Sequence, residues 1–331
     1  MLPLCPTPEV YDRLYRRTAL FERAIATLAA RHNLPTDPTT QFKSGSNVLF
    51  AVGPRHIIKL FAPLFQAEFE RERAGIEAMR PAIAVPVPEL VAQGEFEGWS
   101  YLVITRLAGE LPRVVWDDVP RQDRLAIAGQ MGELVAAIHA APAPAELMVD
   151  WPQFLAAQLE GAAARQLEWG APETWTHKIA PYVERYGPMA APGPLLLQHA
   201  DLHDRNLLIR RTKGRWRLAG VLDFGDALVG EKEYDFVQLV LWLFQAEAGL
   251  FEAFLHTYGL PRPDADFARR MMAFAMLHRF ASLKSMRRLA RPRRPRDLET
   301  LAEILFLGKQ PFAASNSARP GAPKSSEATL L

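Results

Sequence analysis

Two polar clusters, each next to an apolar run, constrain the fold of this chain more than any other feature. The first, HADLHDRNLLI, places Asp201 and Asn206 five positions apart and leads into a leucine-rich strand. The second, VLDFGDA, places Asp223 directly after another apolar run, seventeen residues beyond Asn206. The RTKGR between them is typical of a hairpin turn. Such a hairpin brings its two ends side by side, so we expect Asp201, Asn206 and Asp223 to share one cleft.

Length and composition predict a protein of two lobes with well-buried cores. The chain has 331 residues, of which 49% are hydrophobic, and its formal net charge of +2 indicates no general affinity for nucleic acid. Cys5 is the single cysteine, which excludes an intramolecular disulfide or cysteine-ligated zinc and favours a reducing cytosol. The first residues do not resemble a secretory signal, and the most apolar run, FVQLVLWLF, is about half a membrane span. We therefore expect a soluble, cytoplasmic protein with no membrane partner.

The order of predicted elements divides the chain into a mixed lobe and a helical lobe. Helical periodicity over 8–32 and 64–80 alternates with paired strands, two within 41–63 and two at 90–96 and 100–106. Beyond about residue 109 the pattern is mostly helical, with strands at 195–224. The predicted helices of this part are 121–140, two within 151–186, and several over 234–307. We predict an α+β fold with an N-lobe at 1–107, a C-lobe at 108–308, and a disordered tail at 309–331, where small polar residues and proline prevail.

The polar cleft fits the requirements of phosphoryl transfer from ATP. This reaction requires a carboxylate that positions and deprotonates the acceptor hydroxyl, oxygen ligands for Mg²⁺, and a cation held on the phosphates. Asp201 matches the base, while Asn206 and Asp223 offer the hard oxygen ligands that Mg²⁺ prefers. Lys59 ends the strand HIIK, and Glu72 on the following helix is its expected partner. The alternative partners are Glu68, Glu70 and Glu77.

Over residues 40–245 the order of these motifs resembles the aminoglycoside phosphotransferase and choline kinase-like enzymes, relatives of the protein kinases. FKSGSNVLFAV is similar to the nucleotide loop of that family, and GWSYLVITRLAGELP to the strand and hinge that hold adenine. The resemblance implies a two-lobed protein-kinase-like fold, with a small antiparallel sheet in the N-lobe, a larger helical C-lobe, and ATP and Mg²⁺ as cofactors. The nucleotide-binding residues that it implies are Ser44, Gly45, Ser46, Asn47, Lys59, Glu72 and the backbones of Thr105 and Leu107. It also implies Asp201 as the base, Asn206 and Asp223 as metal ligands, and Asp235 as a structural residue.

Other residues near the motifs have ordinary structural explanations. His199 is expected to hold the loop through a backbone hydrogen bond, and Asp235 to cap the N-terminus of a helix. His203 and Asp204 are expected either to line the acceptor side or to be solvated, and Asp226 either to face the acceptor or to cap a turn. Two departures from the family pattern are Ala200, where the family often has glycine, and the single glycine of the nucleotide loop, Gly45.

The acceptor is less constrained by the sequence. No activation-loop or A-P-E segment is recognisable, which argues against a protein substrate. Residues 110–190 contain eleven Asp or Glu and six Lys or Arg, which favours a cationic acceptor such as an aminoglycoside or similar amino sugar, although a solvated helical surface explains the excess equally well. The alternatives are a metabolic kinase acting on choline, homoserine, a methylthio-sugar or a fructosamine, and a non-catalytic nucleotide-binding regulator.

Two further features bear on partners. Residues 269–296 carry ten Lys or Arg and no acidic residue, which indicates an exposed face or, alternatively, a surface for an anionic partner. Four tryptophans are candidates for stacking on an acceptor or for core packing: Trp116, Trp151, Trp169 and Trp175. We expect a small-molecule acceptor as the partner and no nucleic acid, and the sequence favours no particular oligomeric state.

Overall fold

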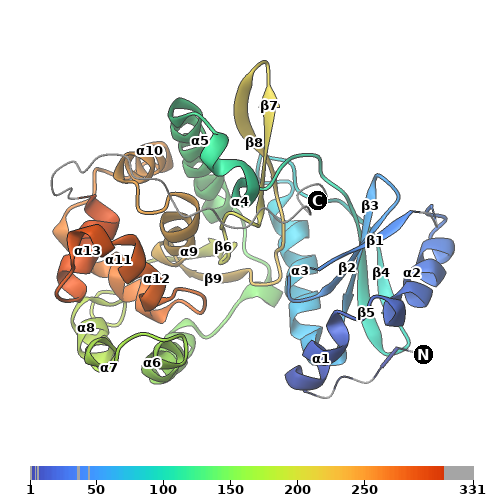
Figure 1. Cartoon of the computed structure of the whole chain (residues 1–331), viewed down its shortest axis with the longest axis horizontal. Helices are drawn as coiled ribbons and strands as arrows, with labels where there is room; N and C mark the ends of the chain where they lie inside the picture. Colours follow the sequence, from blue (N-terminus) through green and yellow to red (C-terminus); the bar gives the residue numbers. More distant parts are fainter. Residues whose placement is uncertain (1, 4, 6, 36–37, 44, 309–331) are drawn as a thin grey trace.

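The computed structural model describes every residue except 1, 4, 6, 36–37, 44 and 309–331. Ser44 of the predicted nucleotide loop and the predicted disordered tail at 309–331 therefore lie outside the described residues. The rest of the chain forms a lobe built on a sheet and a second, mainly helical lobe (Figure 1). The predicted two-lobed α+β architecture is confirmed.

A five-stranded antiparallel sheet, in the order β1-β2-β3-β5-β4, is the centre of the N-lobe. Its strands are β1 (Thr39–Phe42), β2 (Val48–Val52), β3 (His56–Phe61), β4 (Leu90–Phe96) and β5 (Trp99–Thr105). β2 and β3 are the hairpin expected within 41–63, and β1 is an additional strand. Its sequence, TTQF, contains one large apolar residue, and it forms the edge of the sheet, where a strand needs less hydrophobic character.

Side-chain alternation along β3 determines what each face of the sheet contacts. Ile58 and Leu60 pack in one hydrophobic cluster with α1 (Pro8–Tyr15) and α2 (Ala19–Arg31), whereas Ile57 and Phe61 belong to another cluster with α3 (Gln66–Met79). Figure 1 shows α2 on one side of the sheet and α3 on the other. Because alternate residues share a face, Lys59 lies on the side of α3.

The helix expected over 8–32 is two helices, because the chain turns between Tyr15 and Ala19. Gln41 of β1 occupies this turn: its Nε2 donates to the Tyr15 carbonyl at 2.9 Å, and its Oε1 accepts from Thr18 Oγ1 at 2.5 Å. Tertiary hydrogen bonds of this kind replace those of a continuous helix, which the apolar periodicity alone does not reveal.

The C-lobe contains the helical segments predicted from the sequence. Its helices are α4 (Pro112–Val115), α5 (Arg121–Ala140), α6 (Trp151–Glu168), α7 (Glu173–Thr176), α8 (Ile179–Tyr186), α9 (Glu233–Gln238), α10 (Ala248–Tyr258), α11 (Ala265–Leu277), α12 (Leu283–Leu289) and α13 (Leu298–Leu307). A π-helical turn, η4 (Leu239–Leu243), continues α9, and short 3₁₀ turns are η1 (Pro63–Phe65), η2 (Trp116–Asp118), η3 (Ala145–Leu147) and η5 (Arg291–Arg293). No described helix is both long and apolar enough to span a membrane.

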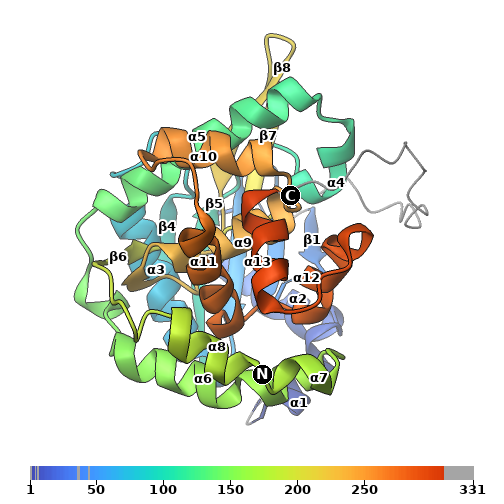
Figure 2. The ribbon, with the colours of Figure 1, turned by 90° about the vertical axis from the view of Figure 1, so that its left-hand side faces the viewer.

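Helix α9 lies inside the C-lobe. All six of its residues are buried, and Figure 2 places the helix near the centre of the lobe, with α11 and α13 close by. In the same view α5 and α10 lie next to each other. A helix buried on every side has a fixed position, so polar side chains that it carries are held rigidly.

Two small antiparallel ladders carry the polar clusters. β6 (Leu195–Gln198) pairs with β9 (Leu228–Glu231), and β7 (Leu207–Thr212) pairs with β8 (Arg215–Val221). The Leu222 N–H donates to the Asn206 carbonyl at 2.9 Å, just beyond the β7–β8 pairing. The two ends of the predicted hairpin therefore meet, and both polar clusters lie at its open end.

Candidate active site

A cavity of about 700 Å³ unites the predicted site residues. Its walls come from both lobes, namely from the β1–β2 loop, β3, α3, the end of β5, the loop before β7, the segment after β8, and α9. The predicted residues that line it are Gly45, Ser46, Asn47, Lys59, Glu72, Thr105, Leu107, Asp201, Asn206 and Asp223. These are all of the predicted site residues except Ser44, whose placement is not described.

Lys59 is held between two carboxylates. Its Nζ lies 2.9 Å from Glu72 Oε2 and 2.9 Å from Asp223 Oδ1. Lys59 and Glu72 are buried, whereas the Asp223 side chain is 41% exposed. The other candidate partners are engaged elsewhere, since Glu70 accepts from Gln66, Glu77 pairs with Arg73, and Glu68 accepts from Asn47.

These three charges shift one another's protonation. Burial raises the pKa of Glu72 to about 7, with Lys59 opposing and the Asp223 carboxylate adding to the rise. Burial also acts to raise the pKa of Asp223, but the charge and hydrogen bond of Lys59 lower it to about 2. Lys59 has a raised pKa, because the two carboxylates outweigh its burial. Lys59 is therefore a fixed cation, and Asp223 a fixed anion, at neutral pH.

A close approach between α3 and the segment after β8 makes this cluster possible. A Cβ atom on Gly75 would lie 2.8 Å from Phe224 Cβ, closer than carbon atoms pack. Only glycine at this position lets α3 approach Phe224, which is itself fully buried. Glu72 is about one turn before Gly75 on the same helix, so the contact brings its carboxylate to Lys59 and Asp223.

The loop that carries Asp201 has an unusual backbone that Asp235 stabilises. Ala200 has φ +62°, the left-handed conformation that favours glycine. The Asp235 carboxylate accepts the Ala200 N–H at 2.5 Å and the His199 N–H at 3.2 Å, and also contacts His139 Nε2 at 3.1 Å. The prediction that Asp235 caps a helix is wrong, because Lys232 is the N-cap of α9 and Asp235 lies inside the first turn.

His199 has the structural role that its position suggested. Its Nε2 donates to the Leu222 carbonyl at 3.0 Å, and its Nδ1 accepts from the Asp201 N–H at 3.3 Å. Burial lowers the pKa of His199, so the ring is neutral and can donate from one nitrogen while accepting at the other. The ring thus ties the Asp201 loop to the strand end before Asp223.

Asp201 and Asn206 are directly hydrogen-bonded. Asn206 Nδ2 donates to Asp201 Oδ2 at 2.9 Å and to the Asp201 carbonyl at 3.0 Å. With its nitrogen committed to Asp201, the carboxamide has its Oδ1 left to serve as a metal ligand. Together with the Asp223 carboxylate, this gives a pair of hard oxygen donors, which fits Mg²⁺.

His203 forms an interaction that its sequence position did not indicate. Its Nε2 lies 3.3 Å from Asp201 Oδ2, and its Nδ1 lies 3.7 Å from Asp204 Oδ1. Burial opposes charge on the imidazole, but the nearby Asp201 and Asp204 carboxylates outweigh it and raise the pKa of His203 to about 9. Arg113 Nη1 in turn lies 3.7 Å from Asp204 Oδ2. A histidine with a raised pKa therefore stands beside Asp201, and its Nδ1 also lies 3.0 Å from the Arg205 backbone nitrogen.

The nucleotide loop and the hinge form the other end of the cavity. Gly45 has φ +113°, and Asn47 Nδ2 donates to Glu68 Oε2 at 3.1 Å, which fastens the loop to α3. The Thr105 N–H donates to the Glu89 carbonyl at 2.9 Å, and Thr105 Oγ1 accepts the Glu89 N–H at 2.8 Å. Of the two backbone groups of Thr105, its carbonyl is thus the one that remains for a ligand.

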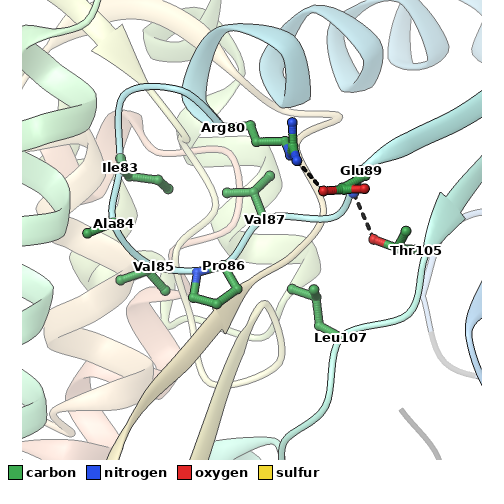
Figure 3. A pocket seen from close by; sticks show the side chains of 9 residues that line it. All are labelled: Arg80, Ile83, Ala84, Val85, Pro86, Val87, Glu89, Thr105 and Leu107. Atoms are coloured by element: carbon green, nitrogen blue, oxygen red, sulfur yellow. Dashed lines mark hydrogen bonds and ion pairs between the residues drawn. The ribbon is translucent and has the colours of Figure 1, made fainter.

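A second cavity, of about 470 Å³, lies behind the hinge. Figure 3 shows that Thr105 and Leu107 border it together with the proline-bearing segment 83–89, and that Arg80 pairs with Glu89 across it. The Val221 N–H donates to the Pro86 carbonyl at 3.0 Å, so this segment connects the hinge region to β8. None of the titratable residues of the main site lines this cavity.

Several residues that line the main cavity were not singled out from the sequence. Among them are Gln238, Trp242 and Phe280, and Asp226 belongs to the same lining. Asp226 Oδ1 pairs with Arg279 Nη2 at 3.0 Å, and burial raises the pKa of Asp226 to about 6 despite that cation. The tryptophans considered from the sequence lie outside the cavity lining, with Trp116, Trp151 and Trp175 buried in the core.

Part of the basic segment at 269–296 is used within the molecule. Arg269 pairs with Asp266 at 2.6 Å, Arg270 with Glu233 at 3.1 Å, and Arg279 with Asp226. The Arg287 guanidinium lies 4.6 Å from the centre of the Trp175 ring. These arginines therefore serve the packing of the C-lobe.

The two-lobed fold and this cluster of residues resemble those of kinase-like phosphotransferases. The chain belongs to the phosphotransferase enzyme family (APH), whose sequence model matches residues 39–274. The solved structures with this fold include a GDP complex of wild-type aminoglycoside 2′-phosphotransferase-IIIa, with a TM-score of 0.64 and 16% identity over 86% of this chain and 95% of that one. The family expected from the motifs is confirmed.

Two other solved structures and one curated protein show the range of the similarity. The GDP and kanamycin complex of APH(2″)-IIIa has a TM-score of 0.61 and 18% identity, covering 81% of this chain and 92% of that one. APH(3″)-Id from Streptomyces rimosus has a TM-score of 0.57 and 15% identity, covering 77% and 97%. Lysine-specific demethylase JMJ21 of Arabidopsis thaliana is 23% identical in an alignment of 218 residues. That alignment covers 53% of this chain and only 23% of the length of that protein.

Proposed function

We propose that this protein transfers the γ-phosphoryl group of ATP to a hydroxyl group of a small molecule, with Asp201 as the base. The observation that carries the proposal is that Lys59, Glu72, Asp201, Asn206 and Asp223 line one cavity between the lobes. Lys59 and Glu72 approach it from the N-lobe, whereas Asp201, Asn206 and Asp223 approach it from the C-lobe, which suits transfer between a nucleotide and a separate acceptor.

Each residue has a proposed task in the reaction. An Asp201 carboxylate oxygen accepts the proton of the acceptor hydroxyl. The hydroxyl oxygen then forms a bond to the γ-phosphorus of ATP, and the bond between that phosphorus and the β–γ bridging oxygen breaks, so that ADP leaves. Lys59 provides a positive charge for the phosphates, and Glu72 holds it in place. Asn206 Oδ1 and the Asp223 carboxylate would hold Mg²⁺, which when bound neutralises charge on the phosphates.

The remaining predicted residues bind the nucleotide in this proposal. The backbone of residues 44–47 covers the phosphates, and the base lies against the hinge, where the Thr105 carbonyl and the Leu107 N–H are its hydrogen-bond partners. The Thr105 N–H already donates to the Glu89 carbonyl, which supports the choice of the Thr105 carbonyl as the partner of the base. A cytoplasmic location suits a protein that uses ATP and has a single cysteine, Cys5, which is buried and free.

Two acceptor classes are candidates. The likeness to aminoglycoside phosphotransferases, one of them in complex with kanamycin, and the acidic excess at 110–190 support an aminoglycoside or similar amino sugar. The pairing of Asp204 with Arg113 and of Asp226 with Arg279 favours instead a metabolic acceptor without several positive charges. A third possibility for the function is a nucleotide-binding regulator that turns over no acceptor. We do not propose nucleic acid as a partner.

The test is release of ADP from Mg²⁺–ATP in a coupled assay, with a panel of aminoglycosides, sugars, choline and homoserine. Asp201→Asn preserves the size of the side chain, and we expect it to lower kcat by about 10² or more, because a positioned base contributes roughly 10²–10⁴. Nucleotide affinity, measured by calorimetry, should persist in that variant. A kcat within twofold of the wild type would remove Asp201 from the role of base. Nucleotide binding without turnover of any acceptor, and without hydrolysis, would favour the regulator.

A further inference from the structure

The helix that holds the Asp201 loop also presents side chains to the cavity. Asp235, Gln238 and Trp242 follow one another at spacings of three and four residues, so they lie along one face of α9 and η4. Asp235 binds the loop backbone at His199 and Ala200, while Gln238 and Trp242 line the cavity. The π-helical turn at Leu239–Leu243 widens the helix at this point, a distortion often found at functional sites.

Gln238 has an unused hydrogen-bonding group in this position. The residue is 1% exposed, and its Oε1 has no hydrogen-bond partner among the residues that the structure describes. A buried polar atom without a partner is unfavourable. Because Gln238 belongs to the cavity lining, a ligand that reaches this side chain could supply the missing partner after a small rotation of the carboxamide. The nitrogen of a carboxamide donates hydrogen bonds and its oxygen accepts them. A hydroxyl group can pair with either atom because it both donates and accepts, whereas an ammonium group only donates and can pair only with the oxygen.

Two aromatic residues, Trp242 and Phe280, line the same cavity as Gln238, and Phe280 is 41% exposed. Arg279 fixes the segment that carries Phe280, because its guanidinium pairs with Asp226 at 3.0 Å and lies 5.3 Å from the centre of the Phe280 ring. Aromatic surfaces of this kind bind the flat apolar face of a ring and leave its polar edge to hydrogen bonds.

The charges in this part of the cavity are already balanced. Of the described residues, Asp201, Asp204 and Asp226 are the carboxylates that line the cavity outside the Lys59 cluster. His203 contacts Asp201 at 3.3 Å, Arg113 contacts Asp204 at 3.7 Å, and Arg279 contacts Asp226 at 3.0 Å. Arg205 also lines the wall. An acceptor with several ammonium groups would have to compete with these cations, which disfavours its binding.

We infer that the acceptor is an uncharged hydroxylated ring compound, such as a sugar or cyclitol without amino groups, bound by Gln238 through a hydroxyl and by Trp242 and Phe280 through its apolar face. The inference rests on the proposed phosphotransferase function and deepens it. Gln238 and the two rings hold the compound next to Asp201, and the paired carboxylates exclude polycations.

Matched acceptors test the charge preference directly. Uncharged sugars, cyclitols and nucleosides are compared with their amino and carboxylate counterparts, for example N-acetylglucosamine with glucosamine and with glucuronic acid, and kanamycin with its fully N-acetylated form. ADP release with Mg²⁺–ATP gives kcat/KM, and tryptophan fluorescence gives affinity. We expect the best uncharged compound to exceed its charged counterpart at least tenfold. Equal or higher values for the charged member, or no binding and turnover of any uncharged member, overturn the inference.

Variants test the residues. Gln238→Leu and Trp242→Ala should each raise the KM of the acceptor at least tenfold more than the KM of ATP. Gln153→Leu, at an exposed glutamine, and Trp169→Ala, at a tryptophan outside the cavity lining, are the matched controls and should not change this ratio. Gln238→Glu adds a carboxylate of the same size with no cation beside it among the described contacts, so it should shift the preference toward the amino counterpart by tenfold or more. An unchanged preference in Gln238→Glu contradicts the inferred contact.

The two levels of the proposal fail in different ways. If the wild-type protein neither binds Mg²⁺–ATP nor releases ADP with any acceptor or with water, the phosphotransferase function itself is wrong. If it uses ATP but prefers the charged acceptors, only the inferred acceptor class is wrong. Melting temperatures of all variants distinguish a loss of folding from a loss of acceptor binding.

Discussion

His203 Nε2 lies 3.3 Å from Asp201 Oδ2, which places an imidazole directly beside the proposed base. The pKa of His203 is raised to about 9, since the nearby Asp201 and Asp204 carboxylates overcome the effect of its burial. The Asp201 carboxyl group therefore favours the charged form of the His203 imidazole. Asp204 contacts the other ring nitrogen of His203 and is itself paired with Arg113. Held in this way, His203 can keep the Asp201 side chain in one orientation.

The His203–Asp201 pair predicts a stability difference that depends on pH. A folded-state pKa above the ordinary value means that the pair stabilises the protein fully below pH about 6.5, and that this contribution disappears as pH rises through about 9. We expect His203→Gln to lower the free energy of unfolding by about 1–3 kcal/mol at pH 6 and much less at pH 9.5. Denaturant unfolding at several pH values measures this. His177→Gln, at an exposed histidine, is the control; a His203→Gln deficit that stays constant with pH would contradict a charged pair.

The Lys59 cluster predicts a double-variant cycle with opposite outcomes for stability and activity. Lys59→Met leaves the buried Glu72 without its cation, and losing one member of a buried pair costs about 3–5 kcal/mol. Lys59→Met combined with Glu72→Gln removes both charges, so much of the stability should return. Activity should not return, because the phosphates still lack the cation. Thermal unfolding and kcat/KM for ATP provide the two measurements, and recovery of both would refute the proposed role of Lys59.

Local patterns predicted the residues whose neighbours lie close in sequence or along one strand. Alternation in HIIK placed Lys59 on one face of a strand, and helical spacing gave four candidate glutamates, among which Glu72 is the one in contact. The close approach of Gly75 to Phe224 decides between them, and it joins segments about 150 residues apart. No local pattern contains that information.

The residues that the sequence did not reveal act through distant partners. Asp235 binds amides 35 and 36 residues away, and a first-turn Asp in a helix has the same sequence signature whether it caps that helix or binds another loop. Gln238 and Trp242 belong to an apolar run that indicates only a buried helix. Their exposure to the cavity depends on how α9 packs in the C-lobe, which helical periodicity cannot specify.

Asp235 predicts a loss of turnover from a residue that does not line the cavity. Asp235→Asn replaces one carboxylate oxygen by an amide nitrogen, which cannot accept a hydrogen bond, so either the His199 or the Ala200 N–H loses its partner. We expect kcat to fall about tenfold or more while the KM of ATP changes little, because the loop shifts and the hinge does not. Steady-state kinetics test this. Asp264→Asn, at the N-cap of α11, is the control, since asparagine caps helices as well as aspartate does. A larger effect on the KM of ATP than on kcat would contradict the role of Asp235 in the loop.

Ala200 predicts that glycine and valine have different effects at one buried position. At φ +62° alanine pays roughly 1–2 kcal/mol for a left-handed backbone, and glycine removes that strain. Glycine also loses a buried methyl group, worth about 0.8 kcal/mol, and gains chain entropy in the unfolded state worth about 0.4–1 kcal/mol. These terms nearly cancel, so Ala200→Gly should change the free energy of unfolding by about 1 kcal/mol or less. Ala200→Val puts a β-branched residue where such residues are outliers, and should destabilise the protein by more than about 2 kcal/mol and reduce turnover. Denaturant unfolding of both variants measures the difference in the free energy of unfolding. If the valine variant is as stable as the glycine variant, residue 200 does not need the left-handed backbone conformation, which directs Asp201 into the cavity.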